Sequence, residues 1–296
     1  MKLMIELPTW LGDAVMASGA VNKLIKYLKP KEVILFGSPV ATSLYPNFKI
    51  IIDDRKNRLR QFFKLPKVDK FVSFRNSLYS KLLAFKYKGV AFNIKEKNLH
   101  MVEKYNLFVN KILKKDLPLY PPQLPFKRKV FKRPTFGINP GAAYGSAKRW
   151  YPEEFAKVAN YLGKYGDIII FGGPGEEKLA KEIEDNLTIK NYKNLCGKLT
   201  IKELCEHIGG LKGFVTNDSG PMHIAAAYNV PTIAIFGPTD YRETSPFSKN
   251  YKIITKNLKC SPCKKRVCPL KHHKCMKLIK AQDVIKVIKE SNIFWT

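Results

Sequence analysis

The sequence predicts an α/β protein with two doubly wound domains, and three observations support this. Short apolar runs alternate with helical patterns in both halves, as in right-handed βαβ units of a mostly parallel sheet. A stretch with five prolines, residues 117–134, separates the halves and cannot sustain a helix. The 296 residues suffice for two domains with separate cores. We therefore expect domains at residues 1–133 and 134–296.

The first domain opens with a clear strand and helix. The apolar run "KLMIELP" predicts a strand, after which Gly12 turns the chain. The next apolar residues recur at i, i+3, i+4 and i+7, which indicates a helix ended by Pro30: Val21, Leu24, Ile25 and Leu28. "EVILFGS" predicts a second buried strand. Residues 49–113 mix short apolar runs with basic residues and give no clear pattern.

The second domain alternates more regularly. Its predicted strands are "PTFGINPG", "DIIIFGG", "NLCGKL", "GFVTND" and "PTIAIFG". Its predicted helices are one with Phe155, Val158, Ala159 and Leu162 on a face, then "EEKLAKEIEDNL", "IKELCEHIGGL" and "PMHIAAAYN". For the last helix of the chain, packing back on the N-terminal domain is an open alternative.

The charge is strongly basic. There are 53 Lys and Arg against 24 Asp and Glu, a net charge of +29, and the excess lies mainly in the first half. Such a field attracts nucleic acid, anionic membranes or phosphorylated substrates, and charge alone does not rank them. The sequence has no secretory signal pattern and no apolar run of about 20 residues, so we expect a cytoplasmic protein.

Three loops at predicted carboxyl ends of strands carry candidate ligand groups: "NPGAAYGSAKRW", "FGGPGEE" and "TNDSGPMHIAAA". A helix N-terminus binds phosphate through unpaired amides, and Ser219 and Gly220 offer such amides. Lys148 adds a full positive charge. The alternative is that Asp218 or Ser219 merely caps the helix. No G-x-G-x-x-G fingerprint or P-loop is present.

Together, "WLGDAVMAS", "GAAYGSAKRW" and "TNDSGPMHIAAAYNVPTIAIFGPTD" resemble the ADP-heptose:lipopolysaccharide heptosyltransferases of glycosyltransferase family 9, especially type II. The resemblance is densest from Asn139 to Cys275 and thinnest from Lys49 to Pro134. It implies a GT-B fold, two Rossmann-like domains facing a cleft, with the acceptor bound by the first and ADP-heptose by the second.

The resemblance also implies residue roles. Asp13 resembles the general base, although it could instead cap a helix starting near Ala14. The donor-binding positions are Lys148, Ser219 and Gly220 for the diphosphate, Asp218 for the sugar, Glu176 for the ribose, the backbone of Leu199 for the adenine, and His223, whose role is open and which alone would suggest a core histidine. No DXD-like pair accompanies this set, so we expect no catalytic metal.

The implied reaction is inverting transfer of heptose from ADP-L-glycero-D-manno-heptose to the heptosyl-Kdo-lipid A inner core of lipopolysaccharide or lipooligosaccharide. The acceptor is anionic, so we expect a peripheral protein on the cytoplasmic face of the inner membrane. Candidate acceptor contacts are Arg55, Arg58, Arg60 and Arg75, with a solvated charged face as the alternative.

Four cysteines follow a C-x2-C-x4-C-x6-C spacing: Cys260, Cys263, Cys268 and Cys275. In a cytoplasmic protein this pattern suggests a structural zinc site, with reduced or oxidised thiols as the alternatives. Cys196 and Cys205 are interpreted as buried small residues. Rival functions within enzymes are heptosyltransferase I or another GT-B nucleotide-sugar enzyme. A remote rival is a basic nucleic-acid-binding protein, but the sequence shows no cluster of aromatic and basic residues for base stacking.

Overall fold

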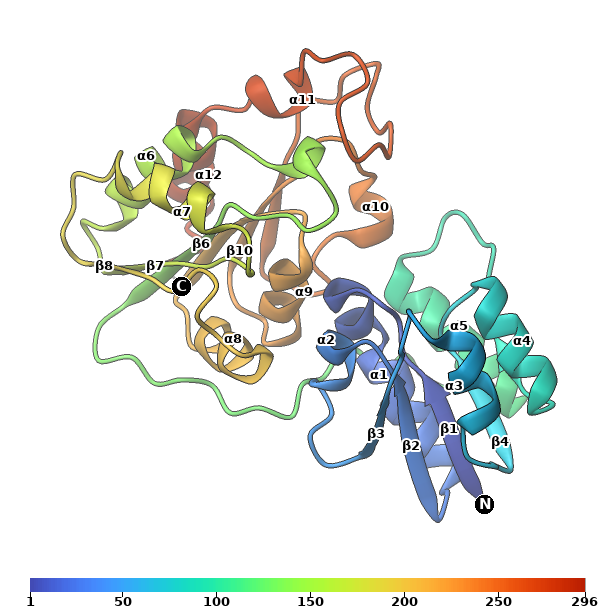
Figure 1. The fold of residues 1–296 in the computed structure, drawn as a ribbon. Helices are drawn as coiled ribbons and strands as arrows, with labels where there is room; N and C mark the ends of the chain where they lie inside the picture. Colours follow the sequence, from blue (N-terminus) through green and yellow to red (C-terminus); the bar gives the residue numbers. More distant parts are fainter. Residues whose placement is uncertain (296) are drawn as a thin grey trace. The chain divides into compact units, whose positions relative to one another are not determined.

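The computed structural model describes residues 1–295, and the chain divides into two compact units between Pro125 and Phe126. Figure 1 shows a parallel sheet with helices in each unit. The boundary precedes the expected one at 133/134 because residues after Pro125 are bound to the second unit. The Tyr228 hydroxyl donates to the carbonyl of Phe126 at 2.9 Å, and Lys129 N donates to the carbonyl of Glu206 at 2.8 Å.

The sheet of the first unit has the order β3-β2-β1-β4-β5, with every pair parallel. Its strands are β1 Lys2–Glu6, β2 Glu32–Gly37, β3 Lys49–Ile52, β4 Lys70–Ser73 and β5 Val90–Ala91. Its helices are α1 Leu11–Leu28, α2 Pro39–Thr42, α3 Arg58–Lys64, α4 Leu78–Lys86 and α5 Met101–Leu113. The region 49–113, unreadable in the sequence, thus holds three strands and three helices.

The core of this unit follows from strand alternation. Met4 pairs in register with Ile34 on β2 and Phe71 on β4, and these residues pack with Leu83 of α4. α1 and α5 pack against each other. At that contact the buried Lys23 ammonium lies 3.4 Å from Asn106 Oδ1, and burial lowers the pKa of this lysine.

The second sheet has the order β11-β10-β9-β6-β7-β8, again all parallel. Its strands are β6 Thr135–Asn139, β7 Asp167–Ile170, β8 Tyr192–Asn194, β9 Gly213–Asn217, β10 Thr232–Ile235 and β11 Tyr251–Ile254. The strand expected within "NLCGKL" is therefore wrong in position, since β8 ends at the first residue of that run. The other four predicted strands overlap β6, β7, β9 and β10.

The helices of the second unit are α6 Pro152–Leu162, α7 Glu177–Glu184, α8 Ile201–Gly209, α9 Gly220–Ala227, α10 Tyr241–Thr244, α11 Lys274–Lys277 and α12 Ala281–Ser291, with a 3₁₀ turn at Ser146–Lys148. α12 packs against α6 and β11 of its own unit. Its buried Val284 and Ile288 join the core around Phe155, which accounts for this position of the last helix.

Candidate functional site

The candidate donor site lies where the strand order of the second sheet reverses. β6 and β9 are neighbours, with β7 and β8 on one side and β10 and β11 on the other. Ligands of doubly wound sheets bind at the carboxyl ends of strands at such a switch point. The loops that leave β6 and β9 there carry Lys148 and the Asp218–Gly220 run.

The start of α9 has no side-chain cap. Ser219 is the N-cap residue with extended backbone, but its side chain makes no capping bond. Ser219 Oγ instead accepts from Asn139 Nδ2 at 3.1 Å. Asp218 is bonded elsewhere, so the interpretation of Asp218 or Ser219 as a mere cap is wrong. The first turn of α9 therefore keeps amides and the positive end of the helix dipole for an anion.

Lys148 and Asp218 form a close ion pair at this point. Lys148 Nζ lies 2.6 Å from Asp218 Oδ2, and both side chains are largely buried. The Thr239 hydroxyl donates to the same oxygen at 2.6 Å. The ammonium also lies 4.7 Å from the centre of the Tyr144 ring. These contacts fix the position of the Lys148 ammonium at the switch point.

Two asparagines that sequence reasoning missed join the β6 and β9 loops. Asn217 donates through Nδ2 to the carbonyl of Pro140 at 2.7 Å and accepts at Oδ1 from Trp150 N at 3.1 Å. Asn139 reaches Ser219 as described, and its Oδ1 is buried with no hydrogen-bond partner among residues 1–295. Their sequence signal is an asparagine at the end of a mostly apolar run.

The remaining predicted donor residues follow the next strands along the sheet. Glu176 follows β7, and its Oε2 accepts from Gly173 N at 2.8 Å. A Cβ atom at Gly141, in the loop after β6, would overlap the Glu176 carboxylate, so the two loops touch. Leu199 is half-buried beyond β8, and His223 is buried within α9. Lys148, Asp218, Ser219 and Gly220 are thus brought together, with Glu176 beside the β6 loop and Leu199 beyond it.

Asp13 belongs to the first unit, in the loop-to-helix segment that follows β1. The strand order of the first sheet reverses between β1 and β4, so this segment also leaves a switch point. Trp10 is the N-cap of α1 and Asp13 is its third residue. The alternative that Asp13 caps a helix near Ala14 is therefore wrong. Burial raises the pKa of Tyr105 on α5, and the charge of Asp13 raises it further.

The four candidate arginines divide into two kinds. Arg75 Nη1 lies 3.0 Å from both Glu6 Oε1 and Asp53 Oδ2, and Arg58 Nη2 lies 2.7 Å from Asp53 Oδ2. Both carboxylates are buried. Arg58 and Arg75 are therefore engaged in a network at the carboxyl end of the first sheet.

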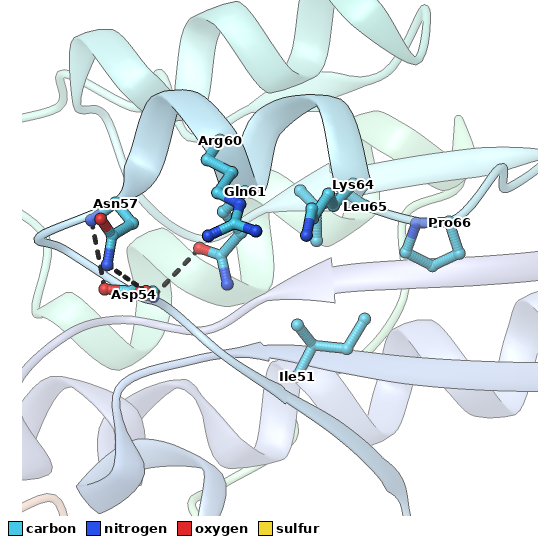
Figure 2. A pocket seen from close by; sticks show the side chains of 8 residues that line it. All are labelled: Ile51, Asp54, Asn57, Arg60, Gln61, Lys64, Leu65 and Pro66. Atoms are coloured by element: carbon cyan, nitrogen blue, oxygen red, sulfur yellow. Dashed lines mark hydrogen bonds between the residues drawn. The ribbon is translucent and has the colours of Figure 1, made fainter.

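Arg55 and Arg60 are exposed and form no ion pair within residues 1–295. Arg60 and Lys64 line a pocket of about 390 Å³ in the first unit (Figure 2). The Asp54 carboxylate in the same pocket is already hydrogen-bonded, because its Oδ2 accepts from Asn57 Nδ2 at 2.9 Å. The two cations are therefore available to an anionic group.

The pKa values of the two buried carboxylates in the arginine network are shifted in opposite directions. Burial raises the pKa of Glu6 despite the nearby Arg75. Burial also acts to raise the pKa of Asp53, but hydrogen bonds from Arg58 and Arg75 outweigh it and leave the pKa lowered. Asp53 thus holds both arginines as an ionised carboxylate.

The four clustered cysteines line one small pocket together with His272 and His273. Burial, followed by the neighbouring thiols Cys268, Cys260 and Cys263, raises the pKa of Cys275 to about 11. Within residues 1–295, however, no set of three or more His, Cys, Asp or Glu side chains has the arrangement of a metal site. His273 is already bonded to the Tyr151 hydroxyl at 3.2 Å and the Ala147 carbonyl at 2.9 Å.

Cys196 and Cys205 are buried, as expected. Among the described residues, none of the helices combines the length and apolar character needed to cross a bilayer.

Comparison with known proteins identifies the family. The family described as "Glycosyltransferase family 9 (heptosyltransferase)" matches residues 77–274. The chain is 44% identical over 313 aligned residues to lipooligosaccharide heptosyltransferase 2 of Campylobacter jejuni, covering 98% of this chain and 99% of the relative.

Solved structures agree on the GT-B fold. The structure of E. coli ADP-heptose lps heptosyltransferase II matches with a TM-score of 0.80 and 23% identity, covering 100% of this chain and 99% of that chain. E. coli heptosyltransferase WaaC with ADP matches with a TM-score of 0.74 and 18% identity, covering 98% and 99%. The chain belongs to glycosyltransferase family 9 and is a glycosyltransferase with the GT-B fold.

Proposed function

We propose that this glycosyltransferase transfers heptose, with inversion, from ADP-L-glycero-D-manno-heptose to the heptosyl-Kdo-lipid A inner core of lipooligosaccharide or lipopolysaccharide. The proposal follows the activity named for the Campylobacter relative and the ADP-heptose named for the E. coli structure. One observation in this chain carries it: the candidate donor groups follow four adjacent strands in the order of the parts of a nucleotide sugar.

Along the sheet, β9 is followed by β6, β7 and β8. The β9 and β6 loops supply Ser219, Gly220 and Lys148 for the diphosphate, the β7 loop supplies Glu176 for the ribose, and Leu199 follows β8 for the adenine. Four strands spaced about 4.8 Å apart span roughly 14 Å. That distance suits a nucleoside diphosphate lying across the strand ends, with the sugar nearest Asp218.

In the proposed reaction, Asp13 accepts the proton of the acceptor hydroxyl as that oxygen attacks the anomeric carbon. The bond to the ADP oxygen breaks, and the diphosphate leaves with its electron pair. A single displacement of this kind inverts the anomeric centre. Lys148 and the α9 amides stabilise the departing charge, which is the role of preorganised donors in such reactions. This leaving-group stabilisation supports the expectation of metal-independent turnover.

The acceptor carries carboxylates and phosphates, and the exposed Arg55 and Arg60 suit such anions better than Arg58 and Arg75, which already bind Asp53. We place the reaction at the cytoplasmic face of the inner membrane, where basic residues near anionic lipid each contribute about 1 kcal/mol.

A structural zinc ion in the cysteine pocket is a separate proposal. Thiolates are ligands that Zn²⁺ prefers, and four thiols line this pocket, but within residues 1–295 they do not stand in a metal-site arrangement. Zinc binding would therefore require Cys260, Cys263, Cys268 and Cys275 to draw together after deprotonation. Elemental analysis of protein purified without chelator tests it, with one zinc per chain expected and a metal-free folded protein contradicting it. Turnover in EDTA tests the catalytic expectation independently.

The proposed donor is tested by a thermal-shift screen with ADP, UDP, GDP and CMP. A ligand at 100 times its dissociation constant adds about 2.7 kcal/mol to the free energy of unfolding. For a domain of this size that raises Tm by roughly 5–10 °C. We expect this shift with ADP and not with UDP, GDP or CMP. In a separate assay, ADP should be released from ADP-heptose when inner-core acceptor is added. Equal shifts with all four nucleotides, or none, would contradict the donor assignment.

A further inference from the structure

Helix α4 turns an apolar stripe toward solvent. Leu78, Leu82 and Phe85 recur at i, i+4 and i+7 and are 75%, 48% and 86% exposed. The opposite side of the helix is packed, with Ser80 and Leu83 fully buried. A helix whose outward face is apolar differs from an ordinary surface helix, whose polar residues face water.

Helix α3 lies beside α4 and adds to this surface. The Phe62 and Tyr79 rings are 6.5 Å apart, and Lys86 Nζ donates to the carbonyl of Phe62. α3 exposes Leu59 and Phe63, at 77% and 75%. We call the five exposed side chains Leu59, Phe63, Leu78, Leu82 and Phe85 the α3–α4 ridge. Large apolar side chains exposed together on two neighbouring helices indicate an interaction surface.

The segment that carries the ridge is rich in cations. From Arg55 to Lys88 the chain carries eleven Lys and Arg residues and one acidic residue, Asp69. Asp69 is already bonded, because its Oδ2 accepts from Lys2 N at 2.6 Å. The cations that are exposed and outside every ion pair found in residues 1–295 are Arg55, Lys56, Arg60, Lys64, Lys67, Lys81 and Lys88.

From this combination we infer that the α3–α4 ridge inserts into the headgroup region of an anionic phospholipid bilayer. Amphipathic surfaces with large apolar side chains and flanking Lys and Arg bind in the plane of the interface, with the apolar face at the acyl boundary. The charge decides between occupants: a second copy of this chain would bring like cations together, whereas an anionic bilayer neutralises them. The inference rests on the proposed function in one respect, namely that the proposed acceptor is a glycolipid held in a membrane.

The first test is sedimentation with vesicles of phosphatidylethanolamine and phosphatidylglycerol, without donor or acceptor. We compare wild type with Phe63→Ser/Phe85→Ser and with the control Val130→Ser, which alters a 91% exposed side chain in the second unit. The double variant should bind at least tenfold more weakly, and the control should bind like wild type. Equal binding by the double variant would overturn the inference.

The second test concerns charge. Lys64→Gln/Lys81→Gln should weaken vesicle binding and its salt dependence more than the control Lys190→Gln/Lys193→Gln, which removes two exposed lysines from the second unit. Equal losses would show that net charge, rather than this surface, binds the vesicles and would overturn the inference. Sedimentation without vesicles measures self-association: a dimer that the ridge variant abolishes while vesicle binding persists would assign the ridge to a second copy.

The ADP thermal shift of each variant reports its folding and donor binding. A retained shift with lost vesicle binding supports the ridge inference. An absent ADP shift in wild type contradicts the proposed donor while leaving the vesicle result interpretable by itself.

Discussion

Lys148 Nζ and Asp218 Oδ2 lie 2.6 Å apart at the junction of β6 and β9, so a buried carboxylate pairs with the cation assigned to the diphosphate. Thr239 holds the same carboxylate oxygen. The pair fixes the ammonium beside the uncapped start of α9. A diphosphate would find the cation already oriented, and preorganised charge of this kind is the main source of electrostatic stabilisation in enzyme sites.

Lys148→Met tests this role. A charge-assisted hydrogen bond contributes about 1.5–3 kcal/mol, so ADP affinity should fall roughly 10- to 100-fold, measured by calorimetry. Turnover should fall further if the charge acts mainly on the leaving group. Lys181→Met is the matched control, because the Lys181–Asp185 pair on α7 is solvent-exposed. Unchanged ADP affinity in Lys148→Met would remove this lysine from the donor site.

Asp13→Asn separates chemistry from helix formation. Asp13 is the third residue of α1 and Trp10 is the N-cap, so the substitution leaves the cap in place. Losing the carboxylate near the helix start costs about 0.3–1 kcal/mol of stability. Loss of a general base slows turnover at least ~100-fold, with ADP binding retained. Single-turnover kinetics measure this, with the exposed Asp116→Asn as control. Near-normal rates would contradict the assignment of Asp13 as the general base.

Gly141→Ala tests the contact between the β6 loop and Glu176. A Cβ atom at residue 141 would overlap the Glu176 carboxylate and displace it. If that carboxylate binds the ribose, ADP affinity should fall about tenfold, the effect of losing one hydrogen bond to a charged group. At Gly173 a Cβ atom would lie 3.7 Å from Glu176 Oε2, an ordinary contact, so Gly173→Ala is the control. Equal ADP affinity in both variants would argue against Glu176 as a ribose ligand.

The sequence predicts the second unit better than the first, and packing explains why. In the second unit apolar residues face the core, so β6, β7, β9 and β10 lie where strands were expected. In α4, Leu78, Leu82 and Phe85 face solvent while Ser80 is buried, which obscures the amphipathic pattern. Nothing local in the sequence separates Arg75 from Arg60, because the partners of Arg75 are Glu6 and Asp53, far away in the chain.

Arg75→Ala should therefore affect stability, whereas Arg60→Ala should affect acceptor binding. Removing one partner from a buried charge network costs about 3–5 kcal/mol, since it leaves an uncompensated charge. Arg75→Ala should lower the free energy of unfolding by that amount, measured in urea. Arg60 is exposed and unpaired in the described chain, so Arg60→Ala should change stability by less than about 0.5 kcal/mol. It should instead raise the KM for the inner-core acceptor, and a large stability loss there would contradict the assignment.

The pH dependence of stability tests the charge state of Asp53. Its pKa is lowered on folding, since the bonds from Arg58 and Arg75 outweigh burial. Its stabilising contribution is therefore complete above the unfolded-state pKa of about 3.9 and is lost as pH falls through the folded-state pKa. Wild type should exceed Asp53→Asn in free energy of unfolding most at pH 7, and the difference should shrink towards pH 3. The Asp53 charge is also a minor cause of the raised Glu6 pKa, so Asp53→Asn relieves part of that shift, and the exposed Asp185→Asn serves as control. A difference that stayed constant from pH 7 to pH 3 would show that Asp53 acts through packing rather than through its charge.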